Sequence, residues 1–219
     1  MNTLKNYSKK GIIIYTIITC FILILLILSL CFYFHQKKAH SDMKRHVSEQ
    51  KLKSYATKHQ AKTIGNEDAK VKIYIFEDLQ CSDCKSLHKH LNEDLNNDIN
   101  NGKVNITFLH HLVINDASTK MAHMEDVIKE LNSTEDFETF QKEAYNNQQT
   151  KDPKTIVRHI DQISNKNEIF KAYDKIKNQK INNDGKKTFD IKSTPTVFIN
   201  GDEIKNYNYI KKAVQKREH

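Results

Sequence analysis

Glycine and proline are scarce in this chain, with five glycines and two prolines among 219 residues. Because so few positions carry either residue, each one is informative about local structure. Pro153 follows Asp152, and a proline at such a place is typical of the first turn of a helix. Asn200-Gly201 is typical of a two-residue β-hairpin turn. We find no internal repeat in the sequence.

The chain also lacks a cluster of basic residues mixed with aromatic ones. Its net charge is +8, but 35 lysines and arginines are scattered among 27 aspartates and glutamates. A nucleic-acid-binding surface needs basic side chains concentrated on one face. We therefore expect no nucleic-acid partner, and we interpret the lysines as a solvated surface.

Charged residues are absent from residues 11–34, which form 24 consecutive positions rich in Ile, Leu, Phe and Tyr. A helix of this length spans roughly 36 Å, enough to cross a bilayer with some tilt. The run is longer than the apolar core of a cleavable signal peptide, and no A-x-A cleavage site follows it. We therefore predict one transmembrane anchor at 11–34 after a cytoplasmic tail at 1–10. The segment argues against a fully soluble cytosolic protein.

Two other interpretations of this segment stay open, namely cleavage and lipidation. A lipoprotein would carry its lipid on Cys31, but Leu30 stands where lipoprotein signals have Gly, Ala or Ser. The orientation is open too, because basic residues flank both ends of the segment and their count does not decide it. Three precede the segment and four follow it within 15 residues: Lys5, Lys9, Lys10, Lys37, Lys38, Lys44 and Arg45.

The rest of the chain divides into a polar stalk and a folded domain. Residues 35–62 are charged and show no convincing apolar stripe, which predicts a stalk between the membrane and the domain. The domain is predicted over residues 63–219. About residues 116–187 repeat apolar side chains at helical spacing and form an insertion of helices. Strands surround this insertion, so the fold class is α/β.

The predicted strands have one face that is strongly apolar. Val71, Ile73 and Ile75 alternate with other residues in the first of them, which is typical of a strand packed on a core. A closing helix is predicted after the last strand, around residues 207–214. The four predicted strands lie at residues 71–76, 103–109, 196–199 and 202–204.

Cysteines are few, and two of the four form a C-x-x-C pair, Cys81 and Cys84. Cys20 and Cys31 lie in the apolar segment instead. The pair follows a predicted strand and opens an amphipathic helix. Unpaired N–H groups and the positive end of the helix dipole favour a thiolate at Cys81, whereas Cys84 would point toward the core. One attackable sulfur and one sheltered sulfur suit thiol–disulfide exchange.

These features resemble a known family, the DsbA-like thiol–disulfide oxidoreductases of the thioredoxin superfamily, and in particular their membrane-anchored, BdbD-type members. The resemblance covers residues 64–219 and implies a thioredoxin-like fold with a helical insertion, preceded by one N-terminal transmembrane helix. It depends on two motifs that lie far apart in the chain and in the order that this family has. The matching segments are Gly65-Asn66, Val71–Phe76, Asp78, Cys81-Ser82-Asp83-Cys84 and Ser193–Gly201.

The resemblance also implies roles for individual residues. Cys81 and Cys84 would be the catalytic redox pair, and no metal or organic cofactor would be needed. The Thr194–Pro195 bond would be cis, a conformation nearly confined to proline. The backbone of Thr194, beside Pro195, would then bind an extended substrate segment next to Cys81.

The chain departs from the family pattern at two places. Ser82 and Asp83 stand between the cysteines, where strong oxidants of the family have Pro-His or Pro-Tyr, so we expect these two residues to tune the redox potential. Ile75 stands at the position that often holds a buried carboxylate for proton transfer. Glu77 or Asp78 could replace that carboxylate, but a polar pair after a strand is typical of a loop.

Three rival interpretations stay open. Cys81, Cys84 and His88 have the spacing of zinc ligands, and His110-His111 could complete such a metal-binding module. A thioredoxin-like interaction module with a static disulfide would keep the fold without the chemistry. A reductase or isomerase would share every motif with an oxidase and differ from it only in redox potential.

The sequence as a whole predicts an extracytoplasmic thiol–disulfide oxidoreductase that introduces disulfides into exported proteins. Cytosolic thiols are kept reduced, so a disulfide donor is useful only outside the membrane. We therefore expect a single-pass protein of the cell membrane with its N-terminus inside. Its expected partners are thiol-containing exported proteins and, through the resemblance, a quinone-linked membrane oxidase that reoxidises the cysteine pair.

Overall fold

The computed structural model describes residues 9–41 and 43–218, and it divides the chain into two compact units, residues 1–43 and 44–219. The first unit contains helix α1, Lys9–Ser41. Within α1, Ile13–Phe32 are long and apolar enough in composition to cross a membrane. Most of the tail predicted at residues 1–10 lies outside the described residues.

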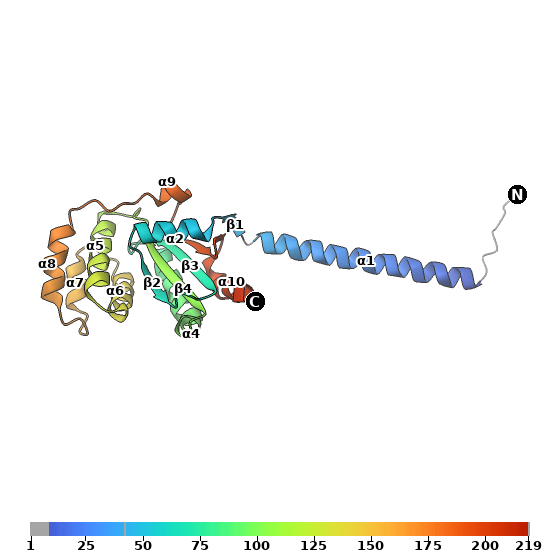
Figure 1. Ribbon diagram of the computed structural model, residues 1–219, viewed down its shortest axis with the longest axis horizontal. Helices are drawn as coiled ribbons and strands as arrows, with labels where there is room; N and C mark the ends of the chain where they lie inside the picture. Colours follow the sequence, from blue (N-terminus) through green and yellow to red (C-terminus); the bar gives the residue numbers. More distant parts are fainter. Residues whose placement is uncertain (1–8, 42, 219) are drawn as a thin grey trace. The chain divides into compact units, whose positions relative to one another are not determined.

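The second unit is built around a mixed sheet with the strand order β1-β6-β5-β3-β4-β2 (Figure 1). The central pair, β3 and β4, is parallel, whereas β2 pairs with β4, β5 with β3 and β6 with β5 in antiparallel fashion. The strands are β1 Met43–His46, β2 Lys62–Gly65, β3 Val71–Glu77, β4 Val104–His110, β5 Thr196–Ile199 and β6 Asp202–Ile204.

Both faces of the sheet are covered, so β3 is buried more completely than its alternating sequence predicts. Ile73 and Ile75 point into the larger core, together with α3 and the helices of the insertion. Tyr74 and Phe76 point to the opposite face and pack in a second core. The prediction that β3 has one strongly apolar face is therefore incomplete, because aromatic side chains of β3 are buried on the other face as well.

The prediction of a stalk at residues 35–62 is wrong, because part of this segment belongs to the second core. Helix α1 continues to Ser41, and α2, Glu49–Lys58, packs on the sheet. Leu52, Tyr55 and Ala56 of α2 are buried with Phe76 and other residues of the second core. The sequence does not predict α2 because only three of its residues form the buried stripe, in a segment that is rich in lysine. The folded unit thus begins near residue 44 rather than 63.

Most helices of the insertion gather at one end of the sheet, whereas its last helix lies apart from them (Figure 1). Asp152 caps α7 and Pro153 is its first residue, as the sequence predicts. The insertion contains α5 Asp116–Leu131, α6 Thr134–Asn146, α7 Pro153–Arg158, α8 Lys166–Ile176 and α9 Gly185–Phe189. Outside it lie α3 Ser82–His90, η1 Leu91–Leu95, α4 Asn96–Asn100, η2 Tyr207–Tyr209 and α10 Ile210–Glu218.

The predicted hairpin turn is present between β5 and β6, and it requires its glycine. Gly201 has φ +88°, and a Cβ atom built on it would overlap the carbonyl oxygen of Val47. We expect Gly201→Ala to lower the free energy of unfolding by about 3 kcal/mol, because left-handed strain and a backbone overlap add. Gly102→Ala is the matched control, because its Cβ would meet only the side chain of Asn66.

Urea unfolding of both variants measures this difference. The cost at Gly102 is expected to be about 1 kcal/mol, since only the left-handed conformation with φ +71° is strained. Equal costs at the two positions would contradict the role assigned to the contact with Val47.

Candidate active site

The cysteine pair lies at the N-terminus of α3, just after the loop that connects β3 to this helix, as the sequence predicts. After β3 ends at Glu77, a short loop leads to Cys81, which is the N-cap residue of α3. The backbone N–H of Cys81 donates to the carbonyl of Asp78 at 2.9 Å and fixes this loop. Cys84 lies in the first turn of α3, and both side chains are free thiols.

The environment of Cys81 favours its thiolate. A hydrogen bond with the thiol of Cys84 lowers the pKa of Cys81 to about 6, although burial opposes the shift. Hydrogen bonds from the side chain of Thr194 and from the backbone amides of Cys84 and Asp83 lower this pKa further. Those amides are the unpaired N–H groups at the start of a helix, which stabilise anions. More than half of Cys81 is therefore ionised at neutral pH.

Cys84 has the opposite character. Burial raises its pKa far above that of an ordinary thiol, and the hydrogen bond with Cys81 and the charge of Glu77 add to the increase. The two thiols differ less in accessibility than the sequence predicts, because Cys81 is only 6% exposed and Cys84 is 0% exposed. Their difference in reactivity is thus mainly a difference in thiol pKa.

Thr194 and Pro195 lie against the reactive sulfur although they are more than a hundred positions away in sequence. The Thr194–Pro195 peptide bond is cis, as the resemblance implies. The thiol of Cys81 donates to the Thr194 carbonyl, with 3.3 Å between Sγ and O. The loop before β5 therefore meets the N-terminus of α3 at the reactive sulfur.

Ser82 and Asp83 are both exposed on the first turn of α3. The part of Asp83 that lowers the pKa of Cys81 is its backbone amide. The side-chain charge of Asp83 acts instead on Tyr207, whose pKa is raised first by burial and then by Asp83. Redox tuning by the side chains of this dipeptide stays a prediction.

Glu77 is the main site residue that the sequence analysis places wrongly. It is the last residue of β3 rather than a loop residue, and it is 1% exposed. Its carboxylate accepts hydrogen bonds from His88 Nε2 at 2.7 Å, Gln141 Nε2 at 3.0 Å and the Tyr145 hydroxyl at 3.1 Å. The helices α3 and α6 supply these donors, so only the tertiary structure reveals that this carboxylate belongs inside.

Asp78 is a buried loop residue with a structural task. Its Oδ2 accepts from the backbone N–H groups of Val113 at 2.9 Å and Ile114 at 3.1 Å, and its Oδ1 accepts from that of Gln80. These bonds join the loop after β4 to the loop before Cys81. As a result, the exposed apolar side chains of Val113 and Ile114 flank the active-site loop.

A second group of buried charges lies beyond Glu77. Gln141 donates to both Glu77 and Glu125, and it thereby bridges the two carboxylates. Burial raises the pKa of Glu125 to about 8, an effect that the nearby His110 opposes. Burial would lower the pKa of His110, but its contacts with Asp126 and Glu125 outweigh that effect and raise it to about 9.

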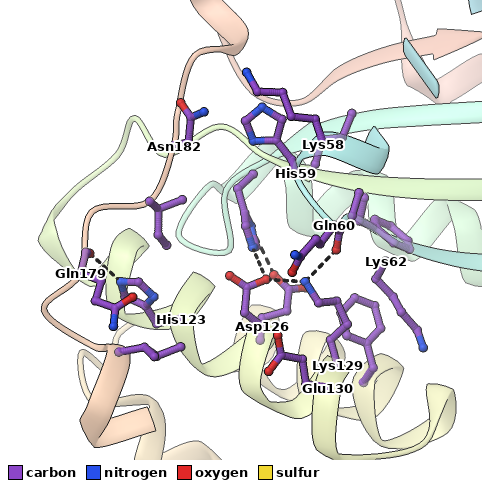
Figure 2. Close-up of a pocket in the computed structure, with 18 of the residues that line it drawn as sticks. Lys58, His59, Gln60, Lys62, His123, Asp126, Lys129, Glu130, Gln179 and Asn182 are labelled. Carbon is purple, nitrogen blue, oxygen red and sulfur yellow. Dashed lines mark hydrogen bonds and ion pairs between the residues drawn. The ribbon is translucent and has the colours of Figure 1, made fainter. Parts of the chain in front are cut away.

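These charges border a cavity of about 380 Å³, which Figure 2 shows. Lys129 extends along one wall, where its Nζ donates to Asp126 Oδ1 at 2.9 Å and to the carbonyl of Gln60 at 2.8 Å. His123 donates to the Gln179 carbonyl on the other side. No local sequence pattern indicates this group, because its members come from β4, α5 and the segments after α2 and α8.

The structure does not assemble the rival metal-binding module. His88 is hydrogen-bonded to Glu77 and His110 to Asp126, so neither is directed at the sulfurs of the cysteine pair. His111 is buried beside Gly185. Among residues 9–41 and 43–218, no group of three or more His, Cys, Asp or Glu side chains is arranged to hold a metal ion.

Solved structures with the same fold come from several bacteria. BdbD from Bacillus subtilis is 22% identical, with a TM-score of 0.60 over 71% of this chain and 91% of that chain. The thiol-disulfide exchange protein alpha-DsbA2 from Wolbachia pipientis is 22% identical, with a TM-score of 0.57 over 76% and 94%. MdbA, a thiol-disulfide oxidoreductase from Corynebacterium matruchotii, is 20% identical, with a TM-score of 0.55 over 75% and 98%.

These similarities show that the domain has the fold of the DsbA-type proteins. No sequence among the curated proteins matches the chain. A family model described as thioredoxin matches residues 56–216, which is most of the chain and nearly all of its folded unit. The strand, the C-x-x-C helix and the Thr-Pro loop that form the site all lie inside the matched residues, and the chain therefore belongs to the thioredoxin family.

Proposed function

We propose that this protein is an extracytoplasmic thiol–disulfide oxidoreductase that introduces disulfides into exported proteins through Cys81 and Cys84. The observation that carries the proposal is the contrast between the two thiols. The pKa of Cys81 is about 6, whereas burial raises that of Cys84 far above the ordinary range. A stable thiolate is a good leaving group, so such a pair gives its disulfide away readily.

The reaction follows from this contrast. In the oxidised pair, a substrate thiolate attacks Cys81 Sγ, the S–S bond breaks, and Cys84 receives the electron pair and then a proton. The substrate is now bound to Cys81 through a mixed disulfide. A second substrate thiolate attacks the substrate sulfur of that bond, and Cys81 leaves as a thiolate. The substrate loses two electrons and the cysteine pair gains two.

The surroundings of Cys81 suit an unfolded polypeptide as substrate. The backbone of Thr194, next to Pro195, lies beside the reactive sulfur and can pair with an extended segment. Val113 and Ile114 add an exposed apolar surface at the same loop. Both features favour thiol-containing exported proteins that have not yet buried their apolar residues.

The helix at Ile13–Phe32 supports the proposed location, with α1 as a membrane anchor and the folded unit outside the cell membrane. A disulfide donor needs an oxidising compartment, which the cytosol is not. A quinone-linked membrane oxidase is the proposed source of oxidising equivalents. The redox equivalent is carried by the two sulfurs, so the proposal includes neither metal nor organic cofactor.

The redox potential tests the direction of the reaction. Because the low pKa of Cys81 stabilises the reduced pair, we expect a potential of about −120 to −180 mV, the range of oxidants and isomerases. The measurement is the ratio of thiol to disulfide after equilibration in graded glutathione buffers. A potential near −270 mV, typical of a thioredoxin, would contradict the oxidase and favour the reductase.

A further inference from the structure

Each catalytic cycle moves a proton to and from Cys84, although no part of this residue is exposed. Cys84 takes up a proton when the pair is reduced and gives it up when the pair is oxidised again. Its high pKa makes the second step slow unless a base accepts the proton. Glu77 is close enough for its charge to act on Cys84, but Glu77 is itself buried and must exchange the proton with another group.

Gln141 and Tyr145 contact Glu77, yet neither suits that exchange. Gln141 leads toward Glu125 and the cavity of Figure 2, but its amide only donates hydrogen bonds to the two carboxylates and neither gains nor releases a proton. Burial raises the pKa of the Tyr145 hydroxyl well above its ordinary value, and the charge of Glu77 adds to the increase. Tyr145 therefore stays protonated.

His88 is the third contact of Glu77 and has different properties. It lies one helical turn after Cys84 on α3, so the two side chains share a helix face. The imidazole is stacked on Phe108, with 5.3 Å between ring centroids, and its side chain is 12% exposed. An imidazole accepts a proton at one ring nitrogen and releases it at the other near neutral pH.

The exposed side of His88 borders a groove of about 690 Å³ between α3 and α6. Charged side chains line both walls of this groove: Lys85 and Lys89 from α3, and Glu138 and Lys142 from α6. The groove therefore brings solvent to an imidazole whose Nε2 is 2.7 Å from the buried carboxylate. A proton can therefore pass from Glu77 to bulk water through the single side chain of His88.

We propose that His88 is a positioning residue that carries protons between Glu77 and the solvent in this groove, and so sets the rate at which Cys84 gains or loses its proton. In the oxidising direction, solvent protonates His88, His88 protonates Glu77, and Glu77 protonates the Cys84 thiolate. In the reverse direction the same proton leaves by the same groups. This proposal rests on the proposed function, because it concerns a step of dithiol exchange.

The test is the rate at which Cys84 resolves a mixed disulfide between Cys81 and glutathione. The full chain is used in detergent micelles, with Cys20 and Cys31 replaced by alanine in every sample, and glutathione release is followed by rapid quench and intact mass. His88→Gln keeps a donor for Glu77 but cannot shuttle a proton. We expect it to slow release by at least about tenfold.

His90→Gln is the matched control, because His90 lies on the same helix and contacts a different carboxylate, Asp94, at 3.2 Å. We expect its release rate to stay within about twofold of the parent. His88→Ala opens space for added imidazole, and we expect imidazole in the buffer to restore much of its rate. The alkylation rate of Cys81 at each pH should be unchanged in His88→Gln.

Three outcomes would overturn the inference: a parental release rate in His88→Gln, an equal loss in His90→Gln, or a shifted alkylation profile of Cys81, which would indicate a structural role. A folded His88→Ala variant that imidazole does not accelerate also counts against it. If His88→Ala does not fold, the result for His88→Gln decides. Failure of the proposed function has a separate signature, because the parent chain itself would then not exchange with glutathione.

Discussion

Replacing Cys81 by serine is expected to lower the rate of oxidation of a reduced two-cysteine peptide by on the order of 10³-fold or more. Cys81 is the sulfur that the Cys84 thiol, Thr194 and the α3 N-terminus stabilise as a thiolate, and it is the only one of the pair that ionises near neutral pH. Serine fills nearly the same space but cannot form a disulfide. The measurement is thiol loss from the peptide with the oxidised protein in excess.

Cys84→Ser is expected to fail in a different way. Cys81 can still attack glutathione disulfide, which supplies the oxidising equivalents and releases one glutathione, and the resulting mixed disulfide should persist because Cys84 no longer resolves it. The serine hydroxyl can donate the hydrogen bond that contributes most to the low pKa of Cys81. We therefore expect Cys81 to be alkylated at neutral pH about as fast in this variant as in the reduced parent.

Cys20→Ala with Cys31→Ala provides the control for both variants, since these thiols lie in α1 and outside the folded unit. Its peptide oxidation rate should equal that of the parent. A Cys81→Ser protein that still oxidises peptide at the parental rate would exclude dithiol chemistry. A Cys81→Ser protein that keeps its full biological effect would favour the rival interaction module with a static disulfide.

The sequence predicts the parts of the site that local patterns encode. The strand before Cys81 alternates, the leucines after Cys84 have helical spacing, and the Thr194–Pro195 motif has a form that the resemblance identifies. Each of these signals lies within a few residues of the feature it predicts. The structure brings Thr194 and Cys81 together as expected, with a contact of 3.3 Å.

The parts that the sequence does not predict depend on contacts between distant segments. Glu77 has the local signature of a loop residue, because nothing near it in sequence shows that α3 and α6 will bring it three donors. For the same reason, the sequence around His88 indicates at most a metal ligand or a surface residue. In α2, the sheet supplies the apolar partner that its weak stripe lacks, so Leu52 is buried in a segment with the composition of a stalk.

The reduced protein should become more stable, relative to Cys81→Ser, as the pH rises from about 6 to about 8. The folded pKa of Cys81 is about 6, whereas an unfolded cysteine has a pKa of about 8.5. A lowered folded pKa gives stabilisation that is complete above the unfolded pKa and is lost as the pH falls through the folded one. The slope between these values is about 1.4 kcal/mol per pH unit.

The comparison with Cys81→Ser is needed because other buried groups titrate in the same window. The raised pKa of His110, about 9, gives stabilisation that is lost as the pH rises, and the raised pKa of Glu125, about 8, acts in the same direction. Both contributions are present in the parent and in the variant, so they cancel in the difference. Cys84 contributes only above about pH 8.5, where the unfolded thiol ionises.

Urea unfolding of both proteins under reducing conditions, at several pH values in this window, measures that difference. We expect it to increase by about 2 kcal/mol between pH 6 and pH 8, because the slope is slightly reduced where each pKa is approached. The same free energy stabilises the reduced pair over the disulfide, so it also raises the redox potential. A difference that does not change with pH would mean that folded Cys81 is not a thiolate, and the oxidising potential would then need another source.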